Sequence, residues 1–235
     1  ERIIHRALYA KADLSLDPKD IARALDPLEF ALDCGLEPDE WQSKLLTAEP
    51  QKALLLCSRQ SGKSTTTALI GLHEAIYHAP ALILLVSPAL RQSQELFRKV
   101  MEFYHNLSGA PEVAQESNLR VEFRNGSRII ALPGSEATVR GYSAARLVVI
   151  DEAARVEDSL LAALRPMLAT SNGRMIALTT PKGKRGWFHD QWHGANEWYK
   201  TKVTAYDCPR ISEAFLEDER REMGDDTCLA CQAYE

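Results

Sequence analysis

The sequence predicts an α/β fold, in which a mostly parallel β-sheet is covered by helices on both faces. Two observations lead to this prediction. Short apolar runs without polar alternation recur along the chain, as expected of strands that are buried on both sides, and segments with helical spacing separate these runs. A fifth strand is predicted at residues 203–206. The four continuous apolar runs are residues 53–57, 82–86, 147–150 and 175–180.

The other predicted elements each have a local signal. Residues 13–47 read as an N-terminal helical segment that is interrupted by prolines. A β-hairpin insertion is predicted where Asn125 and Gly126 separate residues 121–123 from residues 128–132. The remaining helices are predicted at residues 63–78, 91–107, 160–168 and about 211–223.

Composition excludes several classes of protein. The chain has 235 residues, of which 45% are hydrophobic and 26% charged, and this mixture excludes wholesale disorder and a coiled coil. The longest apolar run, residues 81–86, is too short to cross a bilayer. Five scattered cysteines do not suggest a disulfide framework, so we expect a reducing compartment. The net charge of −5 gives no general basic surface, so any contact with nucleic acid needs a local basic patch.

Residues 57–64 are the most informative stretch, because they end a predicted strand and open a predicted helix. Their spacing fits GxxxxGK[ST], with Cys57 in place of the first glycine. In such a loop, successive backbone N–H groups surround the β-phosphate of a nucleotide. Gly62 permits a close approach of the backbone, Lys63 reaches the β- and γ-phosphates, and Ser64 can ligate Mg²⁺. The alternative, a chance match on a loop, is disfavoured by the strand–loop–helix context.

Two carboxylates, Asp151 and Glu152, directly follow the apolar run at 147–150. At the end of a buried strand beside a phosphate loop, the first can hold Mg²⁺ and the second can orient and deprotonate the attacking water. An isolated pair of this kind is commonly no more than two solvated acids at a strand end. Together with the loop, the pair predicts a Mg²⁺-dependent ATPase with a P-loop NTPase fold of the RecA/ASCE-like type.

With these motifs in this order, the chain resembles the ATPase domain of viral large terminases, the motors that package double-stranded DNA into procapsids. The resemblance covers almost the whole chain. The residues that carry it, in chain order, are Trp41-Gln42, the phosphate loop at 58–64, Ser87-Pro88 with Gln92 and Gln94, residues 147–152, and Thr179-Thr180-Pro181.

The resemblance implies a site for ATP and Mg²⁺. Gln42 matches an adenine-reading glutamine, with Trp41 packing nearby, although this pair alone would indicate a helix start with a core aromatic residue. Thr179, Thr180 and Pro181 match a coupling motif that senses the γ-phosphate. The loop residues expected to bind nucleotide are Ser58, Gln60, Ser61, Gly62, Lys63, Ser64 and Thr65.

The resemblance also implies an arginine finger, a guanidinium that offsets charge on the transferring phosphoryl group. Arg140 is the candidate that would act in trans, inserted into the site of a neighbouring subunit, and its alternative is an exposed loop arginine. Arg59, inside the phosphate loop, is the rival candidate and would act in cis. Arg128 and Arg146 are further alternatives.

Two basic groups are candidates for contact with DNA. Lysines and arginines interleaved with glycines suit contact with the phosphate backbone without base readout. For the first group the alternative is a solvated turn. The candidates are Lys182, Lys184 and Arg185, which follow the coupling motif, and Arg120, Arg124 and Arg128 of the hairpin.

Partners, location and domain limits follow from the same resemblance. We expect double-stranded DNA, a homo-oligomeric ring, the portal protein and the small terminase subunit as partners, with no membrane. The expected location is the host-cell cytoplasm, at the procapsid portal during packaging. Residues 1–50 are expected to form a helical lid that contacts adenine, and residues 51–210 the ATPase core. Residues 211–235 are expected to lead towards a linker and a nuclease domain, so no nuclease activity is expected here.

Two other functions remain as alternatives. A helicase-like, nucleic-acid-dependent ATPase shares the glutamine, the phosphate loop and the acidic pair, but would usually carry a second RecA-like domain, and nothing after Tyr206 resembles one. A nucleotide-binding assembly module would bind ATP without cycling.

Overall fold

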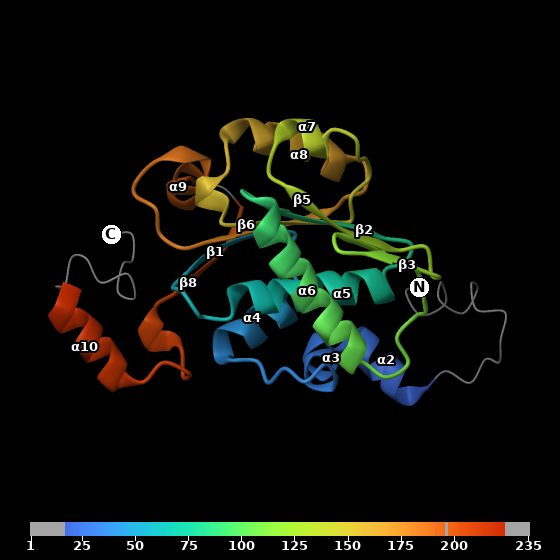
Figure 1. Ribbon diagram of the computed structural model, residues 1–235, viewed down its shortest axis with the longest axis horizontal. Coiled ribbons are helices and arrows are strands. Elements are labelled where there is room, and N and C mark those ends of the chain that lie inside the picture. Colours follow the sequence, from blue (N-terminus) through green and yellow to red (C-terminus); the bar gives the residue numbers. More distant parts are fainter. Residues whose placement is uncertain (1–16, 196, 224–235) are drawn as a thin grey trace.

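A computed structural model describes residues 17–195 and 197–223. Its eight strands are β1 (Lys52–Cys57), β2 (Leu82–Ser87), β3 (Val113–Ser117), β4 (Arg120–Phe123), β5 (Arg128–Pro133), β6 (Leu147–Asp151), β7 (Arg174–Thr179) and β8 (Tyr199–Val203). They form one sheet in the order β3-β4-β5-β2-β6-β7-β1-β8 (Figure 1). The six strands from β5 to β8 in this order are parallel, and β4 and β3 extend the sheet with antiparallel pairings. The prediction of a mostly parallel sheet is confirmed.

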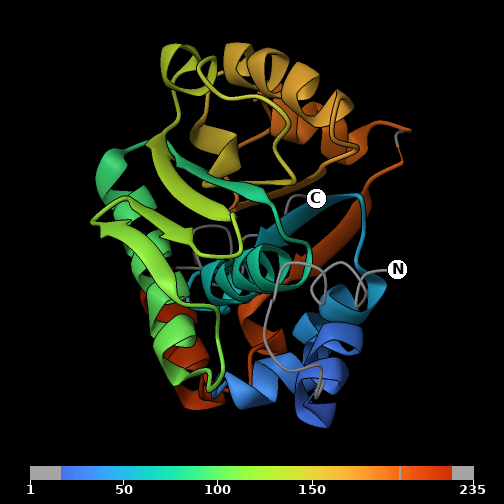
Figure 2. The same ribbon diagram turned by 90° about the vertical axis from the view of Figure 1, so that its right-hand side faces the viewer.

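Helices cover both faces of this sheet, as predicted. They are α2 (Pro18–Leu25), α3 (Pro27–Asp33), α4 (Glu40–Ala48), α5 (Lys63–Tyr77), α6 (Leu90–Asn106), α7 (Glu136–Val139), α8 (Asp158–Ala169), α9 (Gly186–His193) and α10 (Glu213–Met223), with 3-10 turns η1 (Ala153–Arg155) and η2 (Ala205–Asp207). Helices α2 to α6 lie on one side of the sheet and α7 to α9 on the other (Figures 1 and 2). Within the described ranges, no helix combines the length and the apolar character needed to cross a membrane.

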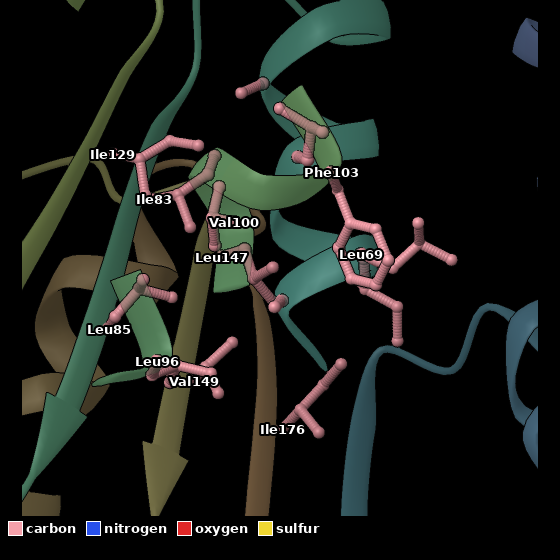
Figure 3. Close-up of a cluster of buried hydrophobic side chains, with 14 of the residues drawn as sticks. Leu69, Ile83, Leu85, Leu96, Val100, Phe103, Ile129, Leu147, Val149 and Ile176 are labelled. Atoms are coloured by element: carbon pink, nitrogen blue, oxygen red, sulfur yellow. The ribbon is translucent and has the colours of Figure 1, made fainter. Parts of the chain in front are cut away.

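Each face of the sheet buries its own hydrophobic cluster, and successive residues of a strand alternate between the two. Ile83 and Leu85 of β2 pack with Leu69 of α5 and Val100 of α6 (Figure 3). Leu84, between them, belongs to the cluster on the opposite face. Because both faces are apolar, the strands show no polar alternation in sequence.

The predicted hairpin is confirmed, since β4 and β5 pair antiparallel around the Asn125-Gly126 turn. Gly126 has φ +86°, and Asn125 Oδ1 accepts a hydrogen bond from the backbone N–H of Ser127 over 2.9 Å. On its other side β5 pairs with β2, so the hairpin continues the main sheet. Strand β3 was not predicted, because its residues are mostly polar and exposed.

The strand predicted at residues 203–206 is wrong in position. The last strand, β8, ends at Val203, and residues 205–207 form η2. The reason is a local cap: Asp207 Oδ2 accepts hydrogen bonds from both the backbone N–H and the hydroxyl of Thr204, each over 2.7 Å. Strand β8 alternates between half-buried and exposed residues and pairs with β1, so it lacks the continuous apolar run of the inner strands.

The strand order determines where the functional motifs meet. Strand β7 lies between β1 and β6 and is parallel to both. The carboxyl ends of parallel strands lie at one edge of a sheet. The phosphate loop after β1, the threonines after β7 and the carboxylates after β6 therefore converge at this edge.

A buried ionic cluster lies at the opposite edge. Glu74, in the last turns of α5, is only 1% exposed. Its carboxylate lies 2.6 Å from Arg174 Nη1 at the start of β7 and 2.9 Å from Arg146 Nε just before β6. Burial alone would raise the pKa of Glu74, but His78 and the two arginines hold it below its ordinary value. Arg146, one of the finger candidates, is thus paired at the far end of β6 from Asp151.

We predict that Glu74→Gln lowers the free energy of unfolding by about 3 kcal/mol, because it leaves two arginines without their shared carboxylate. Urea unfolding followed by circular dichroism measures this change. Glu95→Gln, which disrupts an exposed pair with Arg98, is the control and should cost less than about 0.5 kcal/mol. Equal effects of the two changes would contradict the role of the buried cluster.

Candidate nucleotide-binding site

The loop between β1 and α5 has the backbone that a phosphate cradle needs. Gly62 has φ +85°, a conformation that favours glycine, and a Cβ added there would lie 2.7 Å from Gln42 Nε2, so that amide would have to shift. Inside the loop, Ser61 Oγ donates to the Ser58 carbonyl over 3.0 Å. The Ser58 backbone N–H donates to the Val203 carbonyl over 2.8 Å. The loop is therefore anchored to β8 as well as to β1.

The acidic pair lies against this loop. Ser64 Oγ donates to Asp151 Oδ2 over 3.3 Å. Lys63 Nζ lies 3.7 Å from Glu152 Oε1. Ser64 and Asp151 are 87 positions apart in the sequence. They meet because the order of the strands in the sheet brings the loop and the acidic pair together.

Glu152 is held by three other side chains. Thr180 Oγ1 donates to its Oε2 over 3.2 Å, and Arg155 Nε lies 3.4 Å from the same oxygen. Lys63 faces its other oxygen. The backbone of Glu152 has φ +48°, a strained conformation for a residue with a side chain, which is typical of functional sites. Glu152 is thus fixed at the point where the loop, β6 and β7 meet.

Asp151 has an excess of negative charge around it. Burial raises its pKa, and the neighbouring charge of Glu152 raises it further, against the opposing effects of Lys63, the Glu152 N–H and Ser64. A divalent cation would offset this charge, and the carboxylate and hydroxyl oxygens of Asp151 and Ser64 suit Mg²⁺. Among the described residues no group of three or more His, Cys, Asp or Glu could hold a metal.

The other predicted loop residues differ in exposure. Ser58 and Ser61 are buried, whereas Arg59 and Gln60 are exposed. Thr65, in the first turn of α5, accepts a hydrogen bond from Lys99 Nζ of α6 over 3.3 Å.

Gln42 and Trp41 lie on α4, beneath the loop. Gln42 is 1% exposed; its Oε1 accepts from the Asp39 N–H and its Nε2 donates to Thr66 Oγ1, each over 2.8 Å. Trp41 belongs to the hydrophobic cluster on the α5 face. The adenine-reading role of the pair remains a prediction.

The coupling threonines and the basic loop follow β7. Thr179 Oγ1 donates to the Thr180 carbonyl over 2.9 Å, and Thr180 reaches Glu152 as described. Pro181 and Lys182 are half-buried beyond them. Lys184 and Arg185 are exposed at this edge of the sheet.

The arginines of the hairpin are paired with acids. Arg120 lies 2.5 Å from Glu122, and Arg124 lies 2.8 Å from Glu112. Arg128 is half-buried. These pairs reduce the positive charge that the hairpin presents.

Arg140 ends the short helix α7, where it is exposed and pairs with Glu136 one turn before it. It lines a surface hollow with Met167 and Thr170 at the C-terminal end of α8. The rival candidate Arg59 lies within the phosphate loop itself.

Two residues of the site were not found from the sequence. Arg155 follows Glu152 by three positions on a turn, and this spacing could have indicated a contact. Arg210, which follows β8, donates from Nη2 to the Ser61 carbonyl over 3.2 Å. No local pattern indicates a contact across 149 positions.

Comparison with protein families gives one match over most of the chain. The family model of the N-terminal part of the terminase large subunit, T4-like virus type, matches residues 54–230. No curated protein matches the chain by sequence.

Solved structures share the fold. The large terminase ATPase domain of Thermus phage P74-26 superposes with a TM-score of 0.73 at 19% identity, over 84% of this chain and 93% of that one. A large terminase from a thermophilic bacteriophage, solved with ADP, gives 0.63 at 12% identity, over 78% of this chain and 50% of that one. The HK97 bacteriophage large terminase gives 0.52 at 19% identity, over 61% and 33%. The chain thus spans at most half the length of the large terminases from the thermophilic bacteriophage and from HK97. The shared fold confirms the predicted α/β fold class.

We predict that Asp151→Asn raises the melting temperature of the ligand-free protein near neutral pH. A pKa raised by folding means that the ionised carboxylate destabilises the fold above that pKa. Asparagine can still accept the Glu152 N–H bond, which is 2.9 Å long, without the charge. Differential scanning calorimetry measures the change.

The increase in melting temperature should vanish in acid, below the pKa of an aspartate in the unfolded chain. There Asp151 is protonated in both the folded and the unfolded state. Asp190→Asn, at an exposed site on α9, is the control and should leave the melting temperature nearly unchanged. A lower melting temperature for Asp151→Asn near neutral pH would contradict the charge argument.

Proposed function

Because the chain belongs to the terminase large subunit family, in its T4-like N-terminal form, we propose that it is the ATP-hydrolysing part of a motor that packages double-stranded DNA into a viral procapsid. The observation that carries the proposal is the contact between the phosphate loop and the acidic pair. Ser64 meets Asp151 at 3.3 Å and Lys63 meets Glu152 at 3.7 Å. This is the set of groups that phosphoryl transfer to water requires.

Each residue of the site has a role in hydrolysis. The backbone N–H groups of the loop bind the β-phosphate, and Lys63 neutralises charge on the β- and γ-phosphates. Asp151 and Ser64 would hold Mg²⁺, which would supply positive charge against the negative charge that develops during phosphoryl transfer. Glu152 orients the attacking water and takes its proton.

Thr180 connects this chemistry to the rest of the domain. Its hydroxyl binds Glu152 over 3.2 Å, and the backbone leads directly into Pro181 and the basic loop at 182–185. If loss of the γ-phosphate moves Glu152, the movement would pass through Thr180 to the basic loop, which begins two residues later. We infer that Thr179, Thr180 and Pro181 form the coupling motif.

The position of Arg140 supports it as a finger that acts in trans. It lines a hollow with Met167 and Thr170 at the C-terminal end of α8, whereas α8 begins a few residues after the acidic pair. The 12 residues of α8 span roughly 18 Å, far more than an arginine side chain reaches. Arg140 is exposed, as a residue that enters another subunit must be. Arg59 remains the rival in cis.

DNA contact is assigned to the basic loop in preference to the hairpin. Lys184 and Arg185 are exposed beside the nucleotide site, whereas Arg120 and Arg124 are paired with glutamates. A ring of subunits, the portal protein and the small terminase subunit complete the proposed assembly, which works in the host cytoplasm.

The proposed division of the chain places a lid at residues 1–50, the ATPase core at 51–210 and a connecting segment at 211–235. The contact of Gln42 with Thr66 at 2.8 Å supports a lid next to the nucleotide. The predictions for residues 1–16 and 224–235 lie outside the described residues.

The two alternatives are separated by simple assays. A helicase-like ATPase would separate the strands of a duplex, and a non-cycling assembly module would release no phosphate in the steady state. A packaging motor hydrolyses ATP without separating strands.

We predict that Lys63→Ala and Glu152→Ala each reduce steady-state phosphate release by at least about 100-fold, since each removes a charge placed for the transition state. Glu152→Ala should still bind ATPγS in calorimetry, because the phosphate cradle remains. Glu95→Ala, at an exposed site of α6, should turn over normally. Normal turnover in Glu152→Ala would rule out Glu152 as the general base.

Mixing experiments separate the two finger candidates. Arg140→Ala subunits mixed with Glu152→Ala subunits should recover part of the turnover, because some interfaces then combine an intact base with an intact finger. Arg59→Ala subunits mixed in the same way should recover none if Arg59 acts in cis. Phosphate release at several mixing ratios measures both, and no recovery with Arg140→Ala would show that it does not act in trans.

A further inference from the structure

Arg210 joins three segments of the chain at the phosphate loop. It lies between η2 and α10, and its Nη1 and Nη2 donate to Asp39 Oδ1 and Oδ2 over 2.8 and 2.6 Å. The same Nη2 donates to the Ser61 carbonyl over 3.2 Å. The guanidinium also lies against Gly62, where an added Cβ would be 3.2 Å from Nη2. A single side chain thus connects the start of α4, the loop and the segment after β8.

The contact with Ser61 fixes the orientation of one peptide group. The carbonyl of Ser61 and the N–H of Gly62 belong to the same planar trans peptide and point in opposite directions. By holding the carbonyl, Arg210 turns the Gly62 N–H to the other side of the loop, away from the guanidinium. In a phosphate loop this N–H is one of the donors that surround the β-phosphate.

Asp39 determines where the guanidinium lies. A bidentate pair between arginine and carboxylate fixes both the position and the plane of the guanidinium. Asp39 is itself held, because its backbone N–H donates to Gln42 Oε1 and Gln42 Nε2 donates to Thr66 on α5. The donor to Ser61 is therefore positioned before any ligand arrives.

We propose that Arg210 is a positioning residue for nucleotide binding, which orients the Ser61–Gly62 peptide towards the β-phosphate and is itself aligned by Asp39. The proposal rests on the nucleotide binding proposed above. Because both ADP and ATP carry the β-phosphate, their affinities should depend on Arg210 alike. An arginine that senses the γ-phosphate would affect ATP alone.

Titration calorimetry with ADP and with ATPγS, each with Mg²⁺, tests the proposal. Arg210→Ala should weaken both ligands by roughly 10-fold, as expected for the loss of a charge-assisted hydrogen bond. Arg210→Lys keeps the charge facing Asp39 but cannot reach all three oxygens at once, so its affinities should be intermediate. Arg221→Ala, which removes an exposed ion pair on α10, is the matched control and should bind as the wild type does.

A double-mutant cycle tests the role of Asp39. Asp39→Asn should weaken binding in the wild type but have almost no further effect in the Arg210→Ala background, since it acts through Arg210. Melting temperatures of all variants identify any loss of fold, and Arg210→Lys keeps the test informative if Arg210→Ala does not fold.

Three results would overturn the proposal: wild-type affinities for both ligands in Arg210→Ala, an effect on ATPγS alone, or a full effect of Asp39→Asn without Arg210. A wild-type chain that binds neither nucleotide would instead refute the proposed function, and the inference with it.

Discussion

The structure depends on the placement of two adjacent carboxylates next to a buried lysine and the N-terminus of a helix. Lys63 and Arg155 lie against Glu152 and partly offset the charge of the pair. The pKa of Asp151 is nevertheless raised, first by burial and then by the neighbouring charge of Glu152. In the absence of a cation this arrangement is unfavourable. A divalent cation, as proposed above for Asp151 and Ser64, would offset this charge.

Helix α5 connects the acidic pair to the opposite edge of the sheet. Its first residue is Lys63, and its last turns contain Glu74, which pairs with arginines at the starts of β6 and β7. The helix is therefore anchored at its N-terminal end to the acidic pair after β6 and at its other end to residues at the starts of β6 and β7. Leu69, in the middle, packs against the sheet in the cluster of Figure 3. The loop cannot move independently of the acids without disturbing one of these contacts.

The sequence predicted those parts of the site that depend on local pattern. The loop requires Gly62 and Lys63 at fixed spacing, and a carboxylate directly after an apolar run must lie at a strand end. The convergence of these elements could be inferred because parallel strands end at one edge. The contacts of Arg210 and Glu74 could not be predicted, because they join positions far apart and depend on strand order. The strand placed at residues 203–206 failed because a cap between Thr204 and Asp207 outweighed the β-propensity of the run.

The proposed adenine-reading role of Gln42 would have to coexist with a structural role in the same side chain. An amide that reads adenine uses an acceptor and a donor together. Here Oε1 accepts from the Asp39 N–H and Nε2 donates one of its two protons to Thr66. These two bonds leave the second lone pair of Oε1 and the second N–H of Nε2, so the amide keeps one acceptor and one donor for a base without giving up the bond at the start of α4. Because Asp39 also holds Arg210, a base bound by Gln42 and a phosphate bound by the loop would be connected through Asp39.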